Sequence, residues 1–472
     1  MLHGDRAVRR RWMALLSLGL LLAPRGSSAQ EAAAAAEAAG VRAFSLHEAI
    51  TYAEKRNPDL LVTRARVQAA RAAALVPRAQ WLPSVGATAQ IIGSTVNNST
   101  ATVLSNPRVD LPRIGATRIS AEPDFTPYAS TLVAVGMRQE LFDFGRIAAQ
   151  TAALDAQAEL ERQRAEGAKL DVALRVTEAY WAVRAAKSVA RAADEAAGRA
   201  AAHRDAARAG VGAGLRTPVD LARAEAEVAR FEVAKVRAQG SLAAAQAVFA
   251  AVVGVPDAAL DAGDEASEDE APGALDELLE RAREGSAEIH EAKARVDLAK
   301  AETRAAAALM RPDLFLTAAI SGRAGGATPS NGSTVGGHGF APLVPNWDVG
   351  VVLSVPIYDP VLVARRDALR EVEDVREAEL QATRVMQEAA VRQAHLGLVA
   401  ARQALAALSR AAAAARANHE QAEARFKAGL GTMLELVDAE ALRVEAEVER
   451  AVGGFAVARA RAALQRAVAE VR

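Results

Sequence analysis

Residues 425–449 read RFKAGLGTMLELVDAEALRVEAEVE, a stretch that predicts a tight turn between two long helices. Gly429 and Gly431 lack the Cβ atom that disfavours positive φ, so they can stop the incoming helix. Thr432 follows at the position of a helix N-cap, and the acid Glu435 stands three residues later. We name this helix–turn–helix, with its turn at residues 428–432, the second elbow.

A related stretch, the first elbow, occurs upstream, where residues 214–225 read GLRTPVDLARAE. Its turn covers residues 209–217, and Pro218 falls at the first helical position, where a missing N–H does no harm. A constant shift of 215 residues aligns the two elbows. The matched pairs are Leu215–Leu430, Thr217–Thr432, Leu221–Leu436, Ala224–Ala439 and Glu225–Glu440. The chain therefore reads as a tandem duplication.

Matches outside the elbows support the duplication. Residues 65–67 and Pro83 match residues 294–296 and Pro312 at a shift of 229, and residues 141–143 match 357–359 at a shift of 216. The shift changes mainly across a predicted loop, where insertions are tolerated. The predicted organisation is a first repeat at 45–256, an acidic linker at 257–273 and a second repeat at 274–472.

The N-terminus reads as an export signal. Four arginines between Arg6 and Arg11 precede a short apolar run, and small residues end at Ala29. This pattern predicts a signal peptide over residues 1–29 with cleavage after Ala29; the alternative is an uncleaved anchor helix. Residues 30–44 then form an N-terminal linker. The removed segment holds five Arg and one Asp, so the mature chain is mildly acidic.

Composition excludes several classes of protein. The 472 residues include no cysteine, so disulfides, thiol nucleophiles and iron–sulfur clusters are excluded. A lipid-modified cysteine after the signal is excluded for the same reason. After the signal, no run of 18 consecutive apolar residues predicts a transmembrane helix, so only a closed β-barrel would cross a membrane. Mild acidity argues against nucleic acid as a partner.

Each repeat changes character once, from helix to strand and back. Ser45 and Glu48 form a capping box that starts the first helix, and Asn57-Pro58 interrupts it. Segments rich in Val, Ile, Thr and Gly then predict two β-hairpins, at 84–141 and 313–357. Polar loops at 97–128 and 322–345 lie inside these hairpins. The predicted fold class is mainly α with a small β part.

The longest predicted helices cover residues 146–208 and 361–427. At 1.5 Å per residue each reaches roughly 95 Å, which predicts a coiled coil rather than a globular core. Alanine is abundant and large apolar side chains are sparse, which favours close packing into a broad layer of helices. The alternative is a fibrous coiled coil, but it leaves the four strands unexplained.

Four strands per chain are too few to close a barrel, since small outer-membrane barrels need about eight. Unpaired strand edges are not tolerated in lipid, so the strands predict an oligomer, and a trimer giving twelve strands is the economical solution. Four aromatic residues at the strand–helix changeovers suit a membrane interface, namely Trp81, Phe142, Phe144 and Tyr358. Ordinary core aromatics are the alternative for each residue taken alone.

Several motifs together resemble the TolC-like outer membrane efflux protein family. They are SLHEAI at 45–50, LPS at 82–84, LFDFGR at 141–146, PIYDP at 356–360 and both elbows. The resemblance implies a homotrimer with a twelve-stranded transmembrane β-barrel in the cell outer membrane and a long periplasmic α-barrel. It implies a passive exit duct for efflux or type I secretion, with outer membrane lipid, a periplasmic adaptor and an inner-membrane pump of RND or ABC type as partners. No cofactor is implied.

The resemblance also assigns roles at the elbows. Acids after the second turn would line the periplasmic aperture, here Glu435 and Asp438, with Asp220 and Arg223 at the equivalent places of the first elbow. We hypothesise that Arg216 or Arg223 pairs with Glu435 or Asp438; solvated charges without a gating role are the alternative. Adaptor docking is expected at the elbow residues Gly212, Gly214, Thr217, Gly429, Gly431 and Thr432.

The sequence departs from the family pattern at a few positions. An aromatic–basic lock of the second elbow would need residues that here are Phe426 and Gly431, so a tyrosine-hydroxyl latch is absent. Pro360-Val361 replaces the usual glycine pair after a strand, and Glu140 stands where proline is common. These changes affect the expected local kinks rather than the fold.

No catalytic motif stands out. His419-Glu420 lacks a second histidine four residues later, so no zinc-protease motif is present. The glycine-rich residues 322–339 contain no P-loop lysine. We therefore predict no enzyme activity and no metal site, and multidrug, metal-ion and protein export remain open as cargo. A non-conducting periplasmic coiled-coil scaffold is the alternative function.

Overall fold

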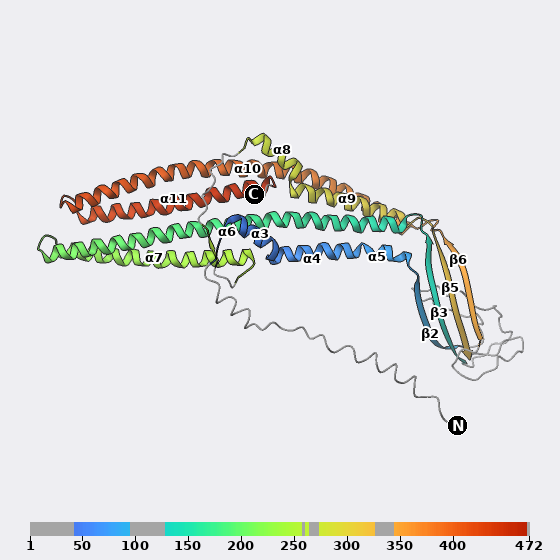
Figure 1. Cartoon of the computed structure of the whole chain (residues 1–472). Helices are drawn as coiled ribbons and strands as arrows, with labels where there is room; N and C mark the ends of the chain where they lie inside the picture. Colours follow the sequence, from blue (N-terminus) through green and yellow to red (C-terminus); the bar gives the residue numbers. More distant parts are fainter. Residues whose placement is uncertain (1–41, 95–127, 257–259, 264–272, 326–343, 470–472) are drawn as a thin grey trace, which may run out of the picture. The chain divides into compact units, whose positions relative to one another are not determined.

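The computed structural model describes residues 42–94, 128–256, 260–263, 273–325 and 344–469 (Figure 1). The predicted signal peptide and most of both hairpin loops lie outside these residues. The helices are α3 (Leu46–Arg56), α4 (Pro58–Ala73), α5 (Leu75–Arg78), α6 (Arg146–Gly212), α7 (Pro218–Val253), α8 (Leu275–Gly285), α9 (Ala287–Ala308), α10 (Pro360–Lys427) and α11 (Met433–Ala467). The strands are β1 (Arg42–Phe44), β2 (Ser84–Ser94), β3 (Tyr128–Phe142), β4 (Leu260–Ala262), β5 (Asp313–Gly325) and β6 (Val344–Ser354), and a 3-10 turn, η1, covers Ala79–Trp81.

The chain divides into two compact units, and both repeats contribute to each. Unit 1 takes its described residues from 1–56, 175–268 and 404–458, and unit 2 from 57–174, 269–403 and 459–472. The long helices α6 and α10, of 67 and 68 residues, supply residues to both units. The mainly helical fold with a small β part is confirmed.

Unit 1 contains a small parallel sheet of β1 and β4, which the sequence did not predict. Both strands lie within segments expected to be linkers. The Tyr180 hydroxyl donates to the Gly263 carbonyl at 2.9 Å, and Lys187 pairs with Asp261 at 2.6 Å. These contacts fix the strand pair against α6, so a few non-local bonds order a segment whose composition alone reads as irregular.

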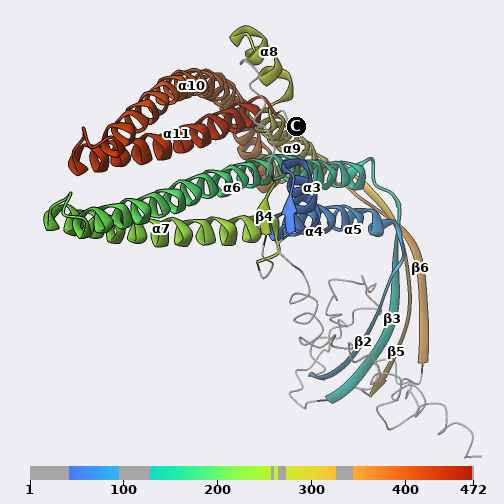
Figure 2. The same ribbon diagram turned by 60° about the vertical axis from the view of Figure 1, so that its left-hand side comes forward.

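Unit 2 contains an antiparallel sheet in the order β2-β3-β5-β6 (Figure 1). The two predicted hairpins form its outer pairs, and β3 pairs with β5 to join them. The strands are 11 to 15 residues long, which is sufficient for a transmembrane β-strand. In Figure 2 the four strands run side by side along a curved sheet whose edges are β2 and β6.

The two faces of this sheet differ in chemistry. One register row places Ala87, Val135, Ile320 and Trp347 on the same face, and the last three are 48%, 66% and 76% exposed. Other rows on this face carry side chains such as Val85 and Val349, which are also exposed. The opposite face carries polar groups, including the Arg138–Asp313 pair at 3.3 Å. An apolar exposed face opposite a polar face is the alternation found in membrane β-barrels.

The passage from strand to long helix uses the same cap in both repeats. Asp143 accepts hydrogen bonds from the backbone of Gly145 and Ile147, and Asp359 accepts from Val361 and Leu362. The first passage also has positive φ at Phe144 and Gly145, of 51° and 88°. Pro360 instead is the first residue of α10. The two passages therefore differ in their backbone at the residues that follow the aspartate.

Helix starts follow the predicted signals, with one additional break. Ser45 and Glu48 form the expected capping box, and Asn57 caps α4. The sequence of residues 275–310 reads as one helix, but the structure interrupts it at Ser286, whose hydroxyl accepts from the Ile289 amide at 3.4 Å. Serine can bond to the backbone in a non-helical conformation, and this competition divides the segment into α8 and α9.

Among the described helices, α7 alone is long and apolar enough to cross a membrane by length and composition. Its best 18-residue window has a mean hydropathy of 1.3, and 22% of that window is buried. This window does not contain 18 consecutive apolar residues, because polar residues interrupt its alanine-rich sequence. The search for an unbroken apolar run therefore did not detect it. Core helices can have the same composition, so this result does not make α7 a membrane span.

Candidate functional site

Both elbow turns have the same backbone structure. In the first, Gly214 has φ of 71°, and the Leu215 and Gly214 amides donate to the carbonyls of Gly210 and Val211 at 2.8 and 3.0 Å. In the second, Gly429 has φ of 74°, and the equivalent amides of Leu430 and Gly429 donate to Arg425 and Phe426 at 2.9 and 3.1 Å. Each is a Schellman motif, and the shift of 215 residues is preserved bond by bond.

Gly431 does not supply the positive φ that the sequence suggested for it. Positive φ occurs at Gly429 and not at Gly431. A Cβ atom on Gly431 would lie 3.1 Å from the Phe426 nitrogen and 3.2 Å from the Arg425 Cβ. Gly431 therefore allows close approach of the chain to the end of α10, and Gly429 alone supplies the left-handed residue.

The helices that leave the elbows are capped as predicted. Thr217 and Asp220 form a reciprocal capping box, with the Asp220 carboxylate accepting from the Thr217 hydroxyl at 2.8 Å and from its amide at 3.1 Å. These hydrogen bonds lower the pKa of Asp220. Thr432 accepts from the Glu435 amide at 3.2 Å. Asp220 therefore caps α7. Its equivalence to an acid of the second elbow suggested a place at the aperture and gave no sign of this capping role.

Arg216 connects the two elbows, but through a partner other than the expected acids. Its guanidinium lies 3.8 Å from the centre of the Phe426 ring and donates to the Phe426 carbonyl at 3.3 Å. Among the described residues, neither Arg216 nor Arg223 forms an ion pair with Glu435 or Asp438. The hypothesised pairing is therefore not formed within one chain, where the ring and carbonyl of Phe426 engage the Arg216 guanidinium.

The two predicted aperture acids are exposed. The Glu435 side chain is 51% exposed and lies 3.9 Å from Arg425, itself 61% exposed. Asp438 is also exposed, one turn further along α11. The pair with Arg425 is long and solvated, so it contributes little stability. Both carboxylates are therefore free to face solvent or another copy of the chain.

Beneath the elbows, four helices share one core, which we call the elbow bundle (residues 196–231 of α6 and α7, and 412–446 of α10 and α11). Its apolar centre contains Ala207, Ala224, Phe426, Met433 and Leu436. Small alanines on α6 and α7 receive the larger side chains of α10 and α11. The elbow bundle therefore packs the two elbows against each other through one apolar core.

A buried charged group in the elbow bundle was not identified from the sequence. Glu440 is 2% exposed, and it contacts Arg199 at 2.9 Å and His419 at 2.7 Å. Helical spacing could have indicated it, because Glu440 follows Met433 and Leu436 at i+7 and i+4 and so shares their buried face. The equivalent residue of the first elbow, Glu225, is exposed and pairs with Arg208, so the match between the repeats does not predict that Glu440 is buried.

The four predicted interface aromatics all lie near the ends of the sheet strands in unit 2. Trp81, Phe142, Phe144 and Tyr358 are 41%, 53%, 46% and 79% exposed. Phe142 and Phe144 pack edge to face, with ring centres 4.7 Å apart. They are therefore surface residues and not core aromatics. Trp347, on the apolar face of β6, joins this exposed aromatic set.

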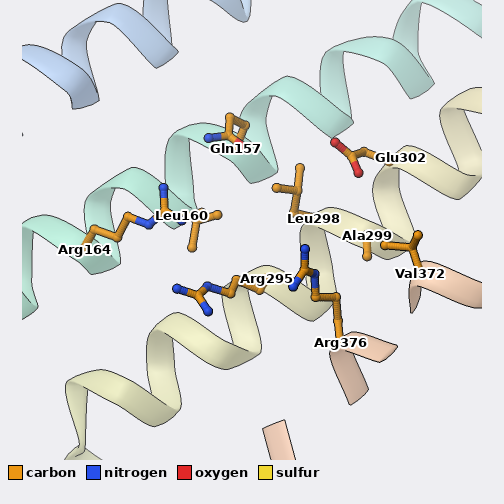
Figure 3. A pocket seen from close by; sticks show the side chains of 9 residues that line it. All are labelled: Gln157, Leu160, Arg164, Arg295, Leu298, Ala299, Glu302, Val372 and Arg376. Atoms are coloured by element: carbon orange, nitrogen blue, oxygen red, sulfur yellow. The ribbon is translucent and has the colours of Figure 1, made fainter. Parts of the chain in front are cut away.

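A cavity of about 300 Å³ in unit 2 is lined by nine residues of α6, α9 and α10 (Figure 3). Three arginines lie around it, and each already has a carboxylate partner. Arg164 pairs with Glu161 and Glu291, Arg295 with Glu291, and Arg376 with Glu379, at 2.6 to 3.0 Å. The charges compensate one another, so this groove offers no free cationic site for an anionic ligand.

Metal-ligating side chains do not gather elsewhere. Within the described ranges, no group of three or more His, Cys, Asp or Glu residues could hold a metal ion. The features available for function are therefore the two elbows, the exposed acids near them and the two-faced sheet.

Comparisons with known proteins agree with this reading. The family model described as outer membrane efflux protein matches residues 49–255 and 278–470, which correspond to the two repeats. No curated protein sequence matches the chain. Among solved structures, the outer-membrane channel OprN aligns with a TM-score of 0.66 and 22% identity over 90% of both chains.

Two further channel structures have the same fold. VceC from Vibrio cholerae aligns with a TM-score of 0.63 and 20% identity over 90% of this chain and 96% of that one. The open state of MtrE from Neisseria gonorrhoeae aligns with a TM-score of 0.65 and 19% identity, over 90% and 89% of the two chains. With the family model matching both repeats, the chain belongs to the outer membrane efflux protein family.

Proposed function

We propose that the chain is the exit duct of a tripartite efflux or type I secretion system. In this role it conducts cargo passively from a periplasmic adaptor and an inner-membrane pump to the exterior. The observation that carries the proposal is the sheet of β2, β3, β5 and β6, which exposes one apolar face and keeps charged pairs on the other. Such a sheet is stable where lipid covers one face and water the other.

The duct is a homotrimer in the outer membrane. The sheet has open edges at β2 and β6, and open edges are not tolerated in lipid. Three copies provide twelve strands, enough to close a barrel. The exposed aromatics Trp81, Phe142, Phe144 and Tyr358 lie at the membrane interface, where aromatic side chains are favoured.

The elbows form the periplasmic end. In a trimer, Glu435 and Asp438 from three copies would give a ring of up to six carboxylates, which attracts cations to the constriction. The Arg216–Phe426 contact holds the two elbows of each copy together beside this ring. Asp220 and Arg223 take part through the cap and the surrounding charge rather than through a direct ion pair.

The elbow tips are the docking surface for the adaptor. Leu215 and Leu430 are 83% and 75% exposed at the turns, and Val219 and Leu434 are 58% and 51% exposed in the following helices. The glycines of both turns (Gly212, Gly214, Gly429 and Gly431) keep the backbone narrow, and Thr217 and Thr432 start the outgoing helices. Apolar tips on narrow turns can insert between helices of a partner.

Single-channel conductance of the purified full-length protein in planar bilayers tests the proposal. We expect a small cation-selective conductance that loses its selectivity when Glu435→Ala and Asp438→Ala are combined. The matched control combines Glu445→Ala with Glu449→Ala, exposed acids further along the same helix. Conductance that both double variants leave equally selective would remove the aperture assignment. A folded trimer that never conducts, even after both aperture acids are replaced, would favour the non-conducting scaffold.

A further inference from the structure

A charged cluster lies inside the elbow bundle and joins three of its helices. Glu440 on α11 accepts from Nε of Arg199 on α6 at 2.9 Å, and its second oxygen lies 2.7 Å from Nε2 of His419 on α10. Arg443 lies 3.4 Å from the other ring nitrogen of His419. Glu440 and His419 are 2% and 1% exposed. A change of charge here cannot be compensated by water without moving a helix.

A second histidine and a fourth helix complete the cluster. The His203 ring on α6 lies 6.5 Å from the His419 ring, centre to centre. His203, Glu440 and Glu227 of α7 line a cavity of about 10 Å³, close to the volume of one water probe. Each of the four helices thus contributes a titratable side chain to the same place, where Glu440 and His419 are buried and His203 and Glu227 are half-buried.

The carboxylates near His203 each lie within 4 Å of a cation, and one oxygen of Glu227 and one of Glu440 accept no hydrogen bond. The charged or titratable groups that act on it are His419, Glu423 and Lys427 of α10 and Glu440 of α11, and Glu227 of α7 lines the same cavity. Arg199 of α6, Arg230 of α7 and Arg443 of α11 contact Glu440, Glu227 and His419 in turn, and Asp438 of α11 lies near Glu227. Glu440 is engaged by Arg199, Glu423 by Lys427 at 2.7 Å, and Glu227 lies 3.5 Å from Arg230. A new positive charge would therefore add to a cluster whose carboxylates already have cations.

Burial lowers the pKa of His203, and the neighbouring His419 and Lys427 lower it further, while Glu440 and Glu423 act in the opposite direction. The packed elbow bundle therefore favours the neutral ring. Separation of the helices would admit water to the ring and restore its ordinary affinity for a proton.

We infer that the cluster around Glu440 is a proton-sensitive latch, which holds the elbow bundle closed at neutral pH and loosens when His203 is protonated. The inference rests on the proposed exit duct, because loosening would move α11 and with it Glu435 and Asp438. The latch makes duct opening respond to periplasmic acidity.

The direction of the pH effect follows from linkage. A histidine whose pKa is lowered in the closed state binds fewer protons there than in the open state. Closure is therefore fully favourable above the ordinary histidine pKa of about 6.5, and it weakens as the pH falls below that value. Glu227 opposes this effect, since burial raises its pKa and its protonation removes a buried charge from the closed state. Without the Glu227 carboxylate, the pH dependence of closure that His203 causes should be larger.

Distance measurement between the elbow tips tests the latch. The chain has no cysteine, so Leu215→Cys with Leu430→Cys places spin labels only at these exposed tips. Double electron–electron resonance on the full-length protein in detergent, frozen at pH 7.5 and 5.0, reports the separation. We expect about a twofold loss of the short-distance population at pH 5.0. A variant labelled only at Leu215→Cys provides the distances between copies.

Two substitutions and a control identify the responsible group. His203→Gln should abolish the pH shift, and Glu227→Gln should enlarge it. His47→Gln replaces an exposed histidine on α3 and should leave the shift unchanged. An equal shift in His203→Gln and in the parent would overturn the latch, as would a smaller shift in Glu227→Gln. The second variant keeps the test decisive if His203→Gln fails to fold.

The measurement does not depend on conduction, so the two proposals fail separately. Bilayer conductance together with pH-independent elbow distances would overturn the latch and leave the exit duct standing. A pH-dependent separation in a protein that never conducts would support the latch as a device of the elbow bundle and overturn the duct.

Discussion

The two elbows have the same backbone and opposite side chains at their tightest contact. In both, the residue at the start of the turn lies against the residue six positions later. Gly210 faces Arg216 in the first elbow, and Arg425 faces Gly431 in the second, so glycine and arginine exchange places. The turn requires one member of the pair to be small, and either position can meet that requirement.

The exchange has a functional consequence. Arg216 projects from the first turn and reaches Phe426 of the second elbow, whereas Arg425 remains on the surface near Glu435. The first elbow therefore provides the group that links the pair, and the second provides the ring that receives it. Duplication followed by divergence has made two similar turns complementary.

The largest difference in stability is expected between substitutions of Glu440 and of Glu225, which occupy equivalent positions in the two elbows. Glu440→Gln removes the buried carboxylate that Arg199 contacts and leaves it only Glu195 at 3.5 Å, so it should cost about 3 kcal/mol, the lower end for a broken buried pair. Glu225→Gln breaks an exposed pair with Arg208 and should cost less than about 1 kcal/mol. Hydrogen exchange of the α7 and α11 amides would measure both, and equal losses would contradict the assigned difference in burial.

The glycine exchange predicts a smaller effect. A Cβ on Gly210 would lie 2.9 Å from the Arg216 Cγ, so Gly210→Ala should cost about 1–2 kcal/mol and recover when combined with Arg216→Gly. Gly431→Ala should cost a similar amount, but Arg425→Gly should not restore it, because the Phe426 nitrogen remains 3.1 Å away. Thermal unfolding of the four variants gives the comparison, and equal rescue at both elbows would contradict it.

The link between the elbows predicts a further, smaller change. Arg216→Ala removes the stacking on Phe426 and should weaken elbow closure by about 0.5–1 kcal/mol. In bilayers this would appear as a higher open probability. Arg223→Ala is the matched control, since Arg223 is exposed and should have no such effect. A response to Arg223→Ala as large as that to Arg216→Ala would argue for a general charge effect.

The smallest expected effect concerns acid. Hydrogen bonds from Thr217 lower the pKa of Asp220, so this carboxylate stabilises the first elbow above the ordinary aspartate value of about 3.9. That stability is lost as the pH falls through the lowered pKa. Because solvent screens the group, the loss should be below about 0.5 kcal/mol. Circular dichroism between pH 5 and 2 should show it in the parent and not in Asp220→Asn, and a persisting loss would place it elsewhere.

Most of the fold could be predicted because its signals are local. Glycine at residues 214 and 429, threonine at 217 and 432, and the Asn57-Pro58 break mark turns and caps through the conformations of single residues. Alternation in β2 and β3 likewise reflects the period of a strand. The break at Ser286 and the β1–β4 pair were missed, since both depend on competition or contact beyond the local pattern.

The candidate site was predicted less completely than the fold. The sequence located both elbows and the acids Glu435 and Asp438, but it did not indicate that Arg216 lies against Phe426 within one chain. Choosing between a carboxylate and an aromatic ring requires the distance between two turns that are about 210 residues apart in the chain. No local rule supplies that distance.

The sequence by itself determined the duplication, the order of the long helices and of the four strands of the larger sheet, and the positions of both elbows. These properties depend on short-range sterics and on periodic burial, which neighbouring residues decide. Tertiary structure alone decided which charges are buried, that Arg216 reaches Phe426, and that Glu440 meets Arg199 and His419. Burial and partner choice arise when distant helices pack, so equivalent residues such as Glu225 and Glu440 acquire different environments from similar sequences.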